Sequence, residues 1–149
     1  MNLGVGRAAY EAALEYAKLR VQGGRRIIEH QAIGTMLAEM VARLETARSV
    51  IWQAAWAADH ADAYADGSLP HLPHATIARI MTAEFVHKVT LDAAQIFGGS
   101  GVMRDLPMQK HVRAGMIFLH SNVSNSAAKF RLAEAVAGYE RPSPAAGGR

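Results

Sequence analysis

The feature that most constrains the fold is a long, glycine-poor segment between about residues 31 and 60, in which apolar residues recur at three- and four-residue steps. This spacing predicts one face of an amphipathic α-helix over roughly seven turns. A helix of about 30 residues spans about 45 Å, which is longer than a small globule needs and favours a bundle that extends toward a partner subunit. The residues on the expected face are Ile33, Met36, Leu37, Met40, Val41, Leu44, Ala47, Ile51, Ala54 and Ala58.

Four other segments also have the composition of helices, because clusters of Gly and Pro punctuate the chain and leave glycine-poor stretches between them. Asn2 is a candidate N-cap of the first helix, and Ser124 is a candidate N-cap of the last. The turn-rich stretch 61–72 is expected to connect the second and third helices at the surface. The expected helices cover about 3–21, 73–97, 108–120 and 125–138.

Together these segments predict an all-α fold, an antiparallel helical bundle of about four to five helices. Residues 1–141 are expected to form this single domain, and residues 142–149 a disordered tail. A length of 149 residues suits one domain. A hydrophobic fraction of 50% with only 7% aromatic residues argues against both a disordered chain and an aromatic-rich β-sandwich.

Composition also excludes several kinds of function. The chain has no cysteine, which excludes a disulfide scaffold, a thiolate zinc site and a cysteine nucleophile. The net charge of +3 is spread along the chain without a basic stripe, so we expect no nucleic-acid partner. Gln53 and Asp59 interrupt the most apolar stretch, and no signal region comes after Met1. We therefore expect a soluble, cytoplasmic protein with no membrane span.

One glycine-rich cluster, from Gln95 to Gly101, lies at the end of the expected third helix. Its glycines fit a helix C-cap, where Gly is favoured because it satisfies the terminal carbonyl groups in a left-handed conformation. Backbone without side chains also lets another chain or a ligand phosphate approach closely. The glycine patterns of nucleotide-binding folds are absent, so the residues alone leave both interpretations open.

A second polar cluster lies between the first and second expected helices. Arg25 and Arg26 near a helix C-terminus would complement the helix dipole. Arg20 precedes this break, and its planar guanidinium is suited to grip a diphosphate with two hydrogen bonds. Gln22 and Gln31 would add neutral hydrogen bonds to such a ligand.

These two clusters, in this order and spacing, resemble the C-terminal helical domain of acyl-CoA dehydrogenases. The resemblance extends over nearly the whole chain up to Tyr139. It rests on the run from Tyr16 to Gln22, Ile27, the His30–Gln31 pair, the run from Gln95 to Gly101, Pro107, Lys110 and Arg113.

The resemblance implies a domain that packs in the middle of a tetramer, built as a dimer of dimers, and that completes the FAD site of a neighbouring subunit. In that family, the Arg and Gln that match Arg20 and Gln22 reach the FAD diphosphate, and the Thr that matches Ser124 contacts the flavin. The implied cofactor-binding residues are Arg20, Gln22, His30, Gln31, Gln95, Ile96, Phe97, Gly98, Gly99 and Ser124.

Two departures from the family pattern bear on activity. Gly23 stands where the family usually has Phe, which removes a packing ring from that turn. Asn122 stands at the position of the family's catalytic Glu, and an amide cannot abstract a proton. Glu84 and Asp105 are alternative carboxylates but are poor candidates for the base. No catalytic residue is therefore assigned to this chain.

The resemblance supports two functions. The first is the C-terminal domain of an acyl-CoA dehydrogenase-like flavoprotein, which would contribute FAD contacts and an oligomer interface for oxidation of acyl-CoA thioesters. The family's two other domains do not fit in this length, so activity of the chain alone is not expected. The alternative is a non-catalytic assembly or scaffold subunit, which the loss of the Glu favours. Expected partners are other copies in a dimer or tetramer, a larger acyl-CoA dehydrogenase subunit where one exists, and acyl-CoA through the full enzyme.

Other candidate sites are weaker. His71 and His74 are closely spaced, but a proline lies between them and no paired carboxylates are nearby, so no metal site is expected. Trp52 and Trp56 stand one turn apart on the long helix. They predict packing in the core or at a subunit interface rather than base stacking or membrane insertion.

Overall fold

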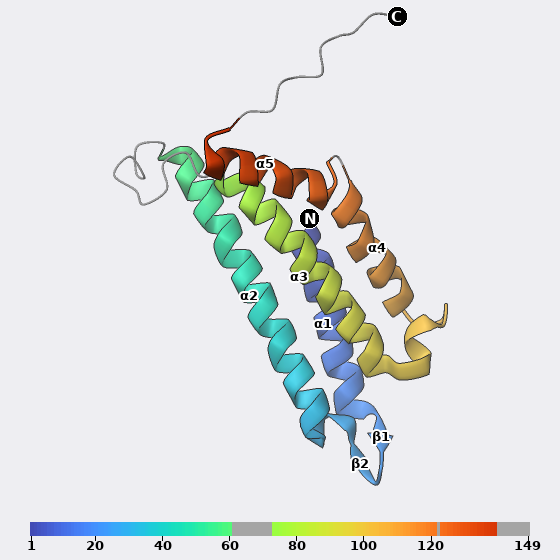
Figure 1. The fold of residues 1–149 in the computed structure, drawn as a ribbon. Coiled ribbons are helices and arrows are strands. Elements are labelled where there is room, and N and C mark those ends of the chain that lie inside the picture. Colours follow the sequence, from blue (N-terminus) through green and yellow to red (C-terminus); the bar gives the residue numbers. More distant parts are fainter. Residues whose placement is uncertain (61–72, 122, 140–149) are drawn as a thin grey trace, which may run out of the picture.

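The computed structural model describes residues 1–60, 73–121 and 123–139, and these residues form an all-α bundle (Figure 1). A two-stranded antiparallel hairpin, β1 (Val21–Gln22) and β2 (Arg25–Arg26), joins the first two helices. Short 3-10 helices within these ranges include η1 (Ile27–Glu29) and η3 (Gly98–Val102). The α-helices are α1 (Asn2–Leu19), α2 (Gln31–Asp59), α3 (His74–Phe97), α4 (Met108–His120) and α5 (Asn125–Ala137). The predicted all-α fold is confirmed.

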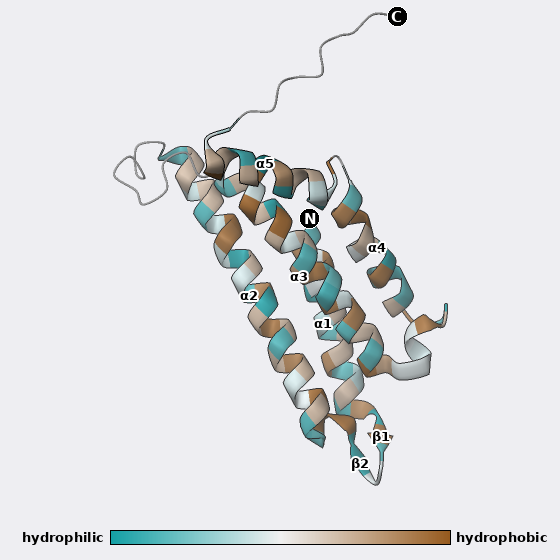
Figure 2. Ribbon diagram, in the orientation of Figure 1, coloured by the Kyte–Doolittle hydropathy of each residue, from teal (hydrophilic) through white to brown (hydrophobic). Residues whose placement is uncertain are grey.

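The third helix, α3, is the centre of the bundle. It contacts α1, α2, α4 and α5, and consecutive helices from α1 to α4 run in opposite directions (Figure 1). Because neighbours enclose it on several sides, α3 buries residues around its circumference, including Ile80, Val86 and Val89. Apolar and polar residues alternate along the surrounding helices, as Figure 2 shows for α2 and α4.

Small residues let α1 approach its neighbours closely. Ala9, Ala13 and Ala17 recur at four-residue steps, so they share one face of the helix, and all three are fully buried. Gly6 continues this stripe, and a Cβ atom there would lie 2.8 Å from Cδ2 of Leu44. Larger side chains fill the rest of the core, among them Leu37, Met40, Leu44, Phe97 and Met108.

The bounds of α1 differ from the prediction at both ends. The helix begins at Asn2 with Met1 as the N-cap residue, so the expected N-cap role of Asn2 is wrong. It ends at Leu19, because Arg20 adopts an extended conformation with φ −70° and ψ 127° and leads into β1. The predicted helical end near Val21 is therefore wrong.

The hairpin between α1 and α2 was not predicted. Gly23 and Gly24 have φ values of 62° and 78°, and two successive positive φ angles are typical of a tight β-hairpin turn. Arg25 and Arg26 lie on β2 rather than at the end of a helix, so their predicted role beside a helix dipole is wrong.

The predicted inner face of α2 is only partly correct. Leu37, Met40, Leu44 and Ala47 are buried, whereas Val41 and Ala58, at expected inner positions, are exposed. Packing of the two tryptophans in the core is also wrong, since Trp52 is 72% exposed and Trp56 is 49% exposed. Their packing at a subunit interface stays a prediction.

The later helices agree closely with the sequence signals. Oγ of Ser124 accepts a hydrogen bond from the backbone N–H of Ala127 at 3.2 Å, which confirms its N-cap role for α5. The predicted connection at 61–72 and the predicted tail at 142–149 lie outside the described residues. Within the described residues, none of the helices has the length and apolar character needed to cross a membrane.

Replacing Gly101 by Ala is expected to lower the free energy of unfolding by about 1–3 kcal/mol, the usual cost of overpacking. A Cβ atom at this buried position would lie 2.5 Å from the backbone carbonyl oxygen of Ala94, so η3 would have to move away from α3. Urea denaturation measures the change. The matched control is Gly99→Ala in the same 3-10 helix, where the added Cβ meets no atom within 4 Å. Equal losses in the two variants would contradict the close contact at Gly101.

Acid is expected to destabilise the fold through His111. Burial, with a smaller contribution from the charge of Lys110, lowers the pKa of His111 from its usual value of 6.5. The unfolded chain therefore binds a proton at His111 more readily than the folded chain does. The contribution of His111 to the free energy of unfolding is complete above pH 6.5 and is lost as the pH falls through 6.5 toward the lower pKa of the folded state. Thermal denaturation between about pH 5 and 8 should show a smaller acid-side loss for His111→Gln than for the wild type. Equal acid-side losses in His111→Gln and the wild type would contradict this role of His111.

Candidate functional site

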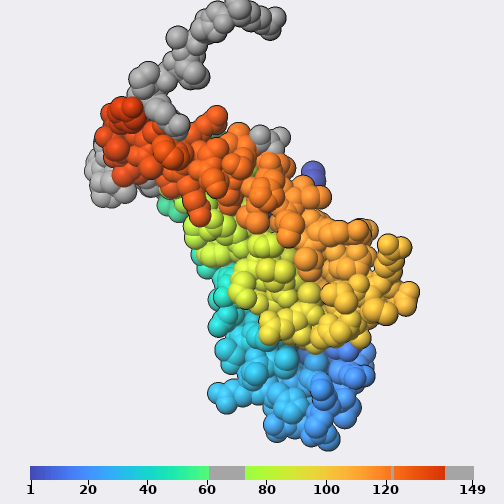
Figure 3. All heavy atoms as spheres, turned by 45° about the vertical axis from the view of Figure 1, so that its right-hand side comes forward, coloured from blue at the N-terminus to red at the C-terminus, as the bar shows by residue number. Residues whose placement is uncertain are grey.

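A pocket of about 880 Å³ opens at the end of the bundle that carries the hairpin. One wall comes from the end of α1, the hairpin and the start of α2, and the other from the end of α3 and η3. Figure 3 shows the end of α3, in yellow, adjoining the blue and cyan surface of the first wall. The lining residues are Tyr16, Arg20, Gln22, Gly23, Ile27, His30, Ile33, Gln95, Ile96, Phe97, Gly98, Gly99, Ser100 and Met103.

Aromatic stacking joins the two walls. The rings of Tyr16 on α1 and Phe97 on α3 stack with centroids 4.2 Å apart and planes at 17°. Ile96 and Phe97 are buried, and Ile27 is buried on the opposite wall. The pocket lining therefore combines apolar and polar side chains, as small-molecule sites usually do.

The end of α3 exposes backbone to the pocket. Gly98 is the C-cap residue with φ 59° and ψ −140°, a conformation that L-residues rarely adopt, and its C-cap role is confirmed. Gly98 and Gly99 are both exposed, and a Cβ atom added at either would meet no atom within 4 Å. A ligand can therefore approach this backbone closely. Gln95, one turn earlier, is exposed and supplies an amide at the same edge.

Arg20 gives the pocket its charge. Among the described lining residues it is the one that carries a permanent charge, and its side chain is exposed. Its backbone is fixed on both sides, because its N–H donates to the carbonyl of Tyr16 at 2.9 Å and its carbonyl accepts from Ile27 N–H at 2.8 Å. Gln22 lies two residues later on β1 and is also exposed. An arginine with neutral amides nearby suits an anionic ligand.

His30 links the hairpin to α2. It is the N-cap residue of α2, and its Nδ1 accepts hydrogen bonds from Nε and Nη2 of Arg25 at 3.3 and 3.1 Å. Because Nδ1 accepts, the proton of the neutral ring is assigned to Nε2, which donates to the backbone carbonyl of Gln22 at 3.0 Å.

The structure brings eight of the ten predicted cofactor-binding residues to this pocket. Gln31 is exposed at the first position of α2 and does not line the pocket. Ser124 lies at the start of α5, at the opposite end of the bundle (Figure 1). Asn122 lies outside the described residues.

Several lining residues were not predicted as site residues. Tyr16, Ile33 and Met103 look like ordinary apolar helix or loop positions in the sequence. The sequence did give one indication that Tyr16 belongs to the site, because it begins the run of residues that leads to Arg20 and Gln22. Its proximity to Phe97 depends on the packing of α1 against α3, which no local pattern reveals.

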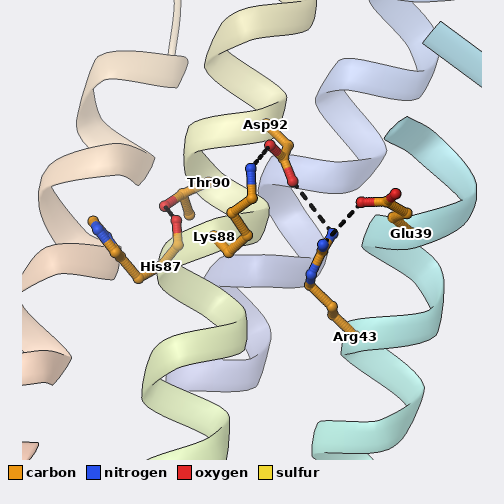
Figure 4. A network of polar contacts seen from close by, with 6 residues as sticks. All are labelled: Glu39, Arg43, His87, Lys88, Thr90 and Asp92. Carbon is orange, nitrogen blue, oxygen red and sulfur yellow. Dashed lines mark hydrogen bonds and ion pairs between the residues drawn. The ribbon is translucent and has the colours of Figure 1, made fainter. Parts of the chain in front are cut away.

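Away from the pocket, a group of charged side chains lies across the interface between α2 and α3 (Figure 4). Asp92 is only 3% exposed, and its carboxylate oxygens pair with Lys88 on the same helix and with Nη1 of Arg43 at 3.4 Å. Arg43 also pairs with Glu39 at 2.8 Å. All carboxylate charge in this cluster is compensated by cations, which indicates a structural role rather than a poised base.

The two carboxylates that were considered as alternative bases, Glu84 and Asp105, lie outside the pocket. Glu84 pairs with Lys129, and Asp105 is exposed in the turn that precedes α4. No group of three or more potential metal-ligating His, Asp or Glu side chains occurs among residues 1–60, 73–121 and 123–139. His71 lies outside these ranges.

Comparison with known proteins gives a consistent result. Residues 1–118 match the family model of the acyl-CoA dehydrogenase C-terminal domain. A 3-sulfinopropanoyl-CoA desulfinase of Paraburkholderia xenovorans is 43% identical over 117 residues, which are 78% of this chain and 28% of that protein. The chain thus spans little more than a quarter of the length of this relative.

Solved structures show the same fold. Butyryl-CoA dehydrogenase from Megasphaera elsdenii superimposes with a TM-score of 0.81 at 30% identity, over 91% of this chain and 34% of that one. A structure described as the FAD complex of PigA gives a TM-score of 0.79 at 26% identity, over 91% of this chain and 34% of that one.

Proposed function

The chain belongs to the acyl-CoA dehydrogenase family, as its C-terminal helical domain, and from this membership we propose that it contributes FAD contacts to an acyl-CoA dehydrogenase-like flavoprotein. The observation that carries the proposal is the pocket itself. Two segments, at residues 16–33 and 95–103, supply Arg20, Gln22, Gln95 and the Gly98–Gly99 backbone to one cavity.

The donor set of the pocket fits part of a dinucleotide. The Arg20 guanidinium can hold a diphosphate through two parallel hydrogen bonds, and the exposed backbone at Gly98 and Gly99 leaves space for a phosphate or sugar. The amides of Gln22 and Gln95 can bond sugar hydroxyls or base edges. Ile33 and Met103 are the more accessible apolar side chains of the lining, and they can offer apolar surface to a planar ring.

The chemistry of the whole enzyme would come from the bound cofactor, since FAD supplies the hydride acceptor for oxidation of an acyl-CoA thioester. This chain's residues would bind and orient one part of FAD. The sequence has Asn122 at the family's Glu position, and an amide cannot serve as the general base. We therefore infer that the chain does not oxidise acyl-CoA alone.

Self-association belongs to the same proposal. Large apolar side chains are exposed along α2, α4 and α5, including Trp52, Ile117 and Phe130. We infer that a partner covers part of this exposed apolar surface. A dimer or tetramer of this chain, with or without a larger acyl-CoA dehydrogenase subunit, would cover it and would bring a pocket wall from a second subunit to the FAD.

A second candidate function is a non-catalytic assembly or scaffold subunit. Asn122 favours it, because the residue needed for proton abstraction is missing while the bundle fold is retained. The two candidates differ in one observable. The flavoprotein subunit requires FAD in the native complex, whereas the scaffold does not.

Gentle purification of the chain from its source cells, with the mass and visible flavin absorbance of the eluted complex, tests the proposal. A complex with stoichiometric flavin is the expected result, with absorbance bands near those of free FAD. A flavin-free complex that contains only this chain would contradict the flavoprotein proposal and favour the scaffold.

A further inference from the structure

We propose that Arg25 is a positioning residue, which holds the β1–β2 hairpin in place beside the pocket by fixing His30. Arg25 does not itself line the pocket. The proposal rests on the proposed function, because it assigns Arg25 a role toward the same FAD contacts.

The hairpin needs an anchor that it cannot supply from its own apolar side chains. Every residue from 21 to 26 is exposed, so none of these side chains enters the core. Its turn consists of Gly23 and Gly24, which have no side chain to pack. The ladder joins only two residue pairs, and a hairpin this short is not stable by itself in water.

Arg25 and His30 tie both strands to the start of α2. Arg25, on β2, donates from Nε and Nη2 to Nδ1 of His30. Nε2 of the same ring then donates to the carbonyl of Gln22 on β1. A neutral imidazole has one donor and one acceptor nitrogen, so the bonds from Arg25 select the ring form that can bond Gln22.

The anchor is rigid because the backbone of His30 belongs to the first turn of α2. Its carbonyl accepts from Ile33 N–H at 3.0 Å and from Gly34 N–H at 3.1 Å. Its N–H donates to the carbonyl of Ile27 at 3.1 Å. The hairpin is thereby held to a long packed helix rather than to another loop.

This arrangement determines where two pocket residues lie. Gln22 is bonded directly by His30, and Arg20 immediately precedes β1. Without Arg25, the ring of His30 would lose its fixed orientation and the hairpin would sample more positions. Ordering these residues again on binding would then reduce ligand affinity.

Amide hydrogen exchange of the full chain tests the anchor without any ligand. The Ile27 N–H, which bonds to the Arg20 carbonyl across the base of the hairpin, is the probe. Arg25→Ala should speed its exchange by about three- to tenfold, the effect expected when a hydrogen bond that restrains a local segment is lost. The imidazole ¹⁵N shifts of His30 should also change.

Arg26→Ala is the matched control, because it removes the same charge from the same strand and Arg26 is also exposed. It should leave the His30 shifts as in the wild type, and also the protection of the Ile27 N–H, which is its exchange rate relative to the intrinsic rate for each sequence. Arg25→Lys keeps the charge but loses the guanidinium fork, so its exchange should fall between wild type and Arg25→Ala. Equal exchange in Arg25→Ala and Arg26→Ala would overturn the anchor.

Measuring the FAD affinity of the assembled flavoprotein distinguishes a failure of the Arg25 anchor from a failure of the proposed function. Arg25→Ala should weaken FAD binding several-fold more than Arg26→Ala, because pocket residues lose their positions and not only a nearby charge. If exchange changes as expected but neither Arg20→Ala nor Arg25→Ala alters FAD affinity, the proposed function fails together with the role of Arg25 toward FAD. If Ile27 exchange does not change in Arg25→Ala, the inference fails whatever the affinity for FAD.

Discussion

Replacing Arg43 by Leu is expected to lower the free energy of unfolding by about 3 kcal/mol, because the buried carboxylate of Asp92 would then keep only Lys88 as a charged partner. Asp92 is 3% exposed, so water cannot replace the lost cation. Breaking a buried ion pair from one side is costly for this reason. Urea denaturation followed by circular dichroism measures the loss.

Arg48→Leu on the same helix is the matched control. Arg48 pairs with Glu45 at 3.3 Å, and these side chains are 41% and 60% exposed, so loss of the pair should cost less than about 1 kcal/mol. The double variant Arg43→Leu with Asp92→Leu should recover part of the stability, since it also removes the buried carboxylate that has lost one of its two cations. Equal losses for Arg43→Leu and Arg48→Leu would show that burial of Asp92 does not strengthen the network.

Replacing Arg20 by Ala is expected to weaken FAD retention in the assembled flavoprotein by about 1.5–3 kcal/mol, the contribution of a hydrogen bond to a charged group. This corresponds to roughly a tenfold to hundredfold loss of affinity. Arg20 is the permanently charged residue among the described residues that line the pocket, so its loss leaves a diphosphate without a cation on this wall.

The measurement is the FAD concentration needed to restore flavin to the apoprotein, monitored by protein and flavin fluorescence. Arg26→Ala removes an exposed positive charge from the neighbouring strand and should change the affinity little, because Arg26 does not line the pocket. An unchanged affinity in Arg20→Ala would remove Arg20 from the FAD site.

The helices were predictable because their apolar residues are periodic. The long stripe from Ile33 to Ala58 marked α2, and Ser124 marked the start of α5. The hairpin was not predictable in the same way, since strands of two residues are too short to show alternation. Gly23 and Gly24 therefore indicated the end of a helix but not the two strands that flank them.

The buried charge of Asp92 was also not predictable. In sequence it stands among ordinary positions of an amphipathic helix, where a carboxylate usually faces solvent. It is buried because α3 has neighbours on several sides, which is a property of the assembled bundle. Its partner Arg43 comes from another helix, so no spacing along the chain connects them.

The residues of the candidate site were largely predictable from the sequence, but their positions in the fold were only partly predictable. The resemblance to a family marked both segments, and packing of α1 against α3 brings most of their residues to one pocket. Gln31 comes directly after His30 but, as the exposed first residue of α2, does not line the pocket, whereas Ile33 does. Ser124 lies at the far end of the bundle, so it and Arg20 cannot share one compact pocket on the same chain (Figure 1).

The two-walled pocket has a consequence for how the protein folds. Neither wall is complete within a single helix, and the walls meet through side chains as far apart in sequence as Tyr16 and Phe97. Such contacts form only after a long chain loop has closed, which delays them relative to helix formation. During refolding, far-ultraviolet ellipticity should therefore recover before the capacity to bind a ligand in the pocket, and binding will report docking of the helices rather than their presence.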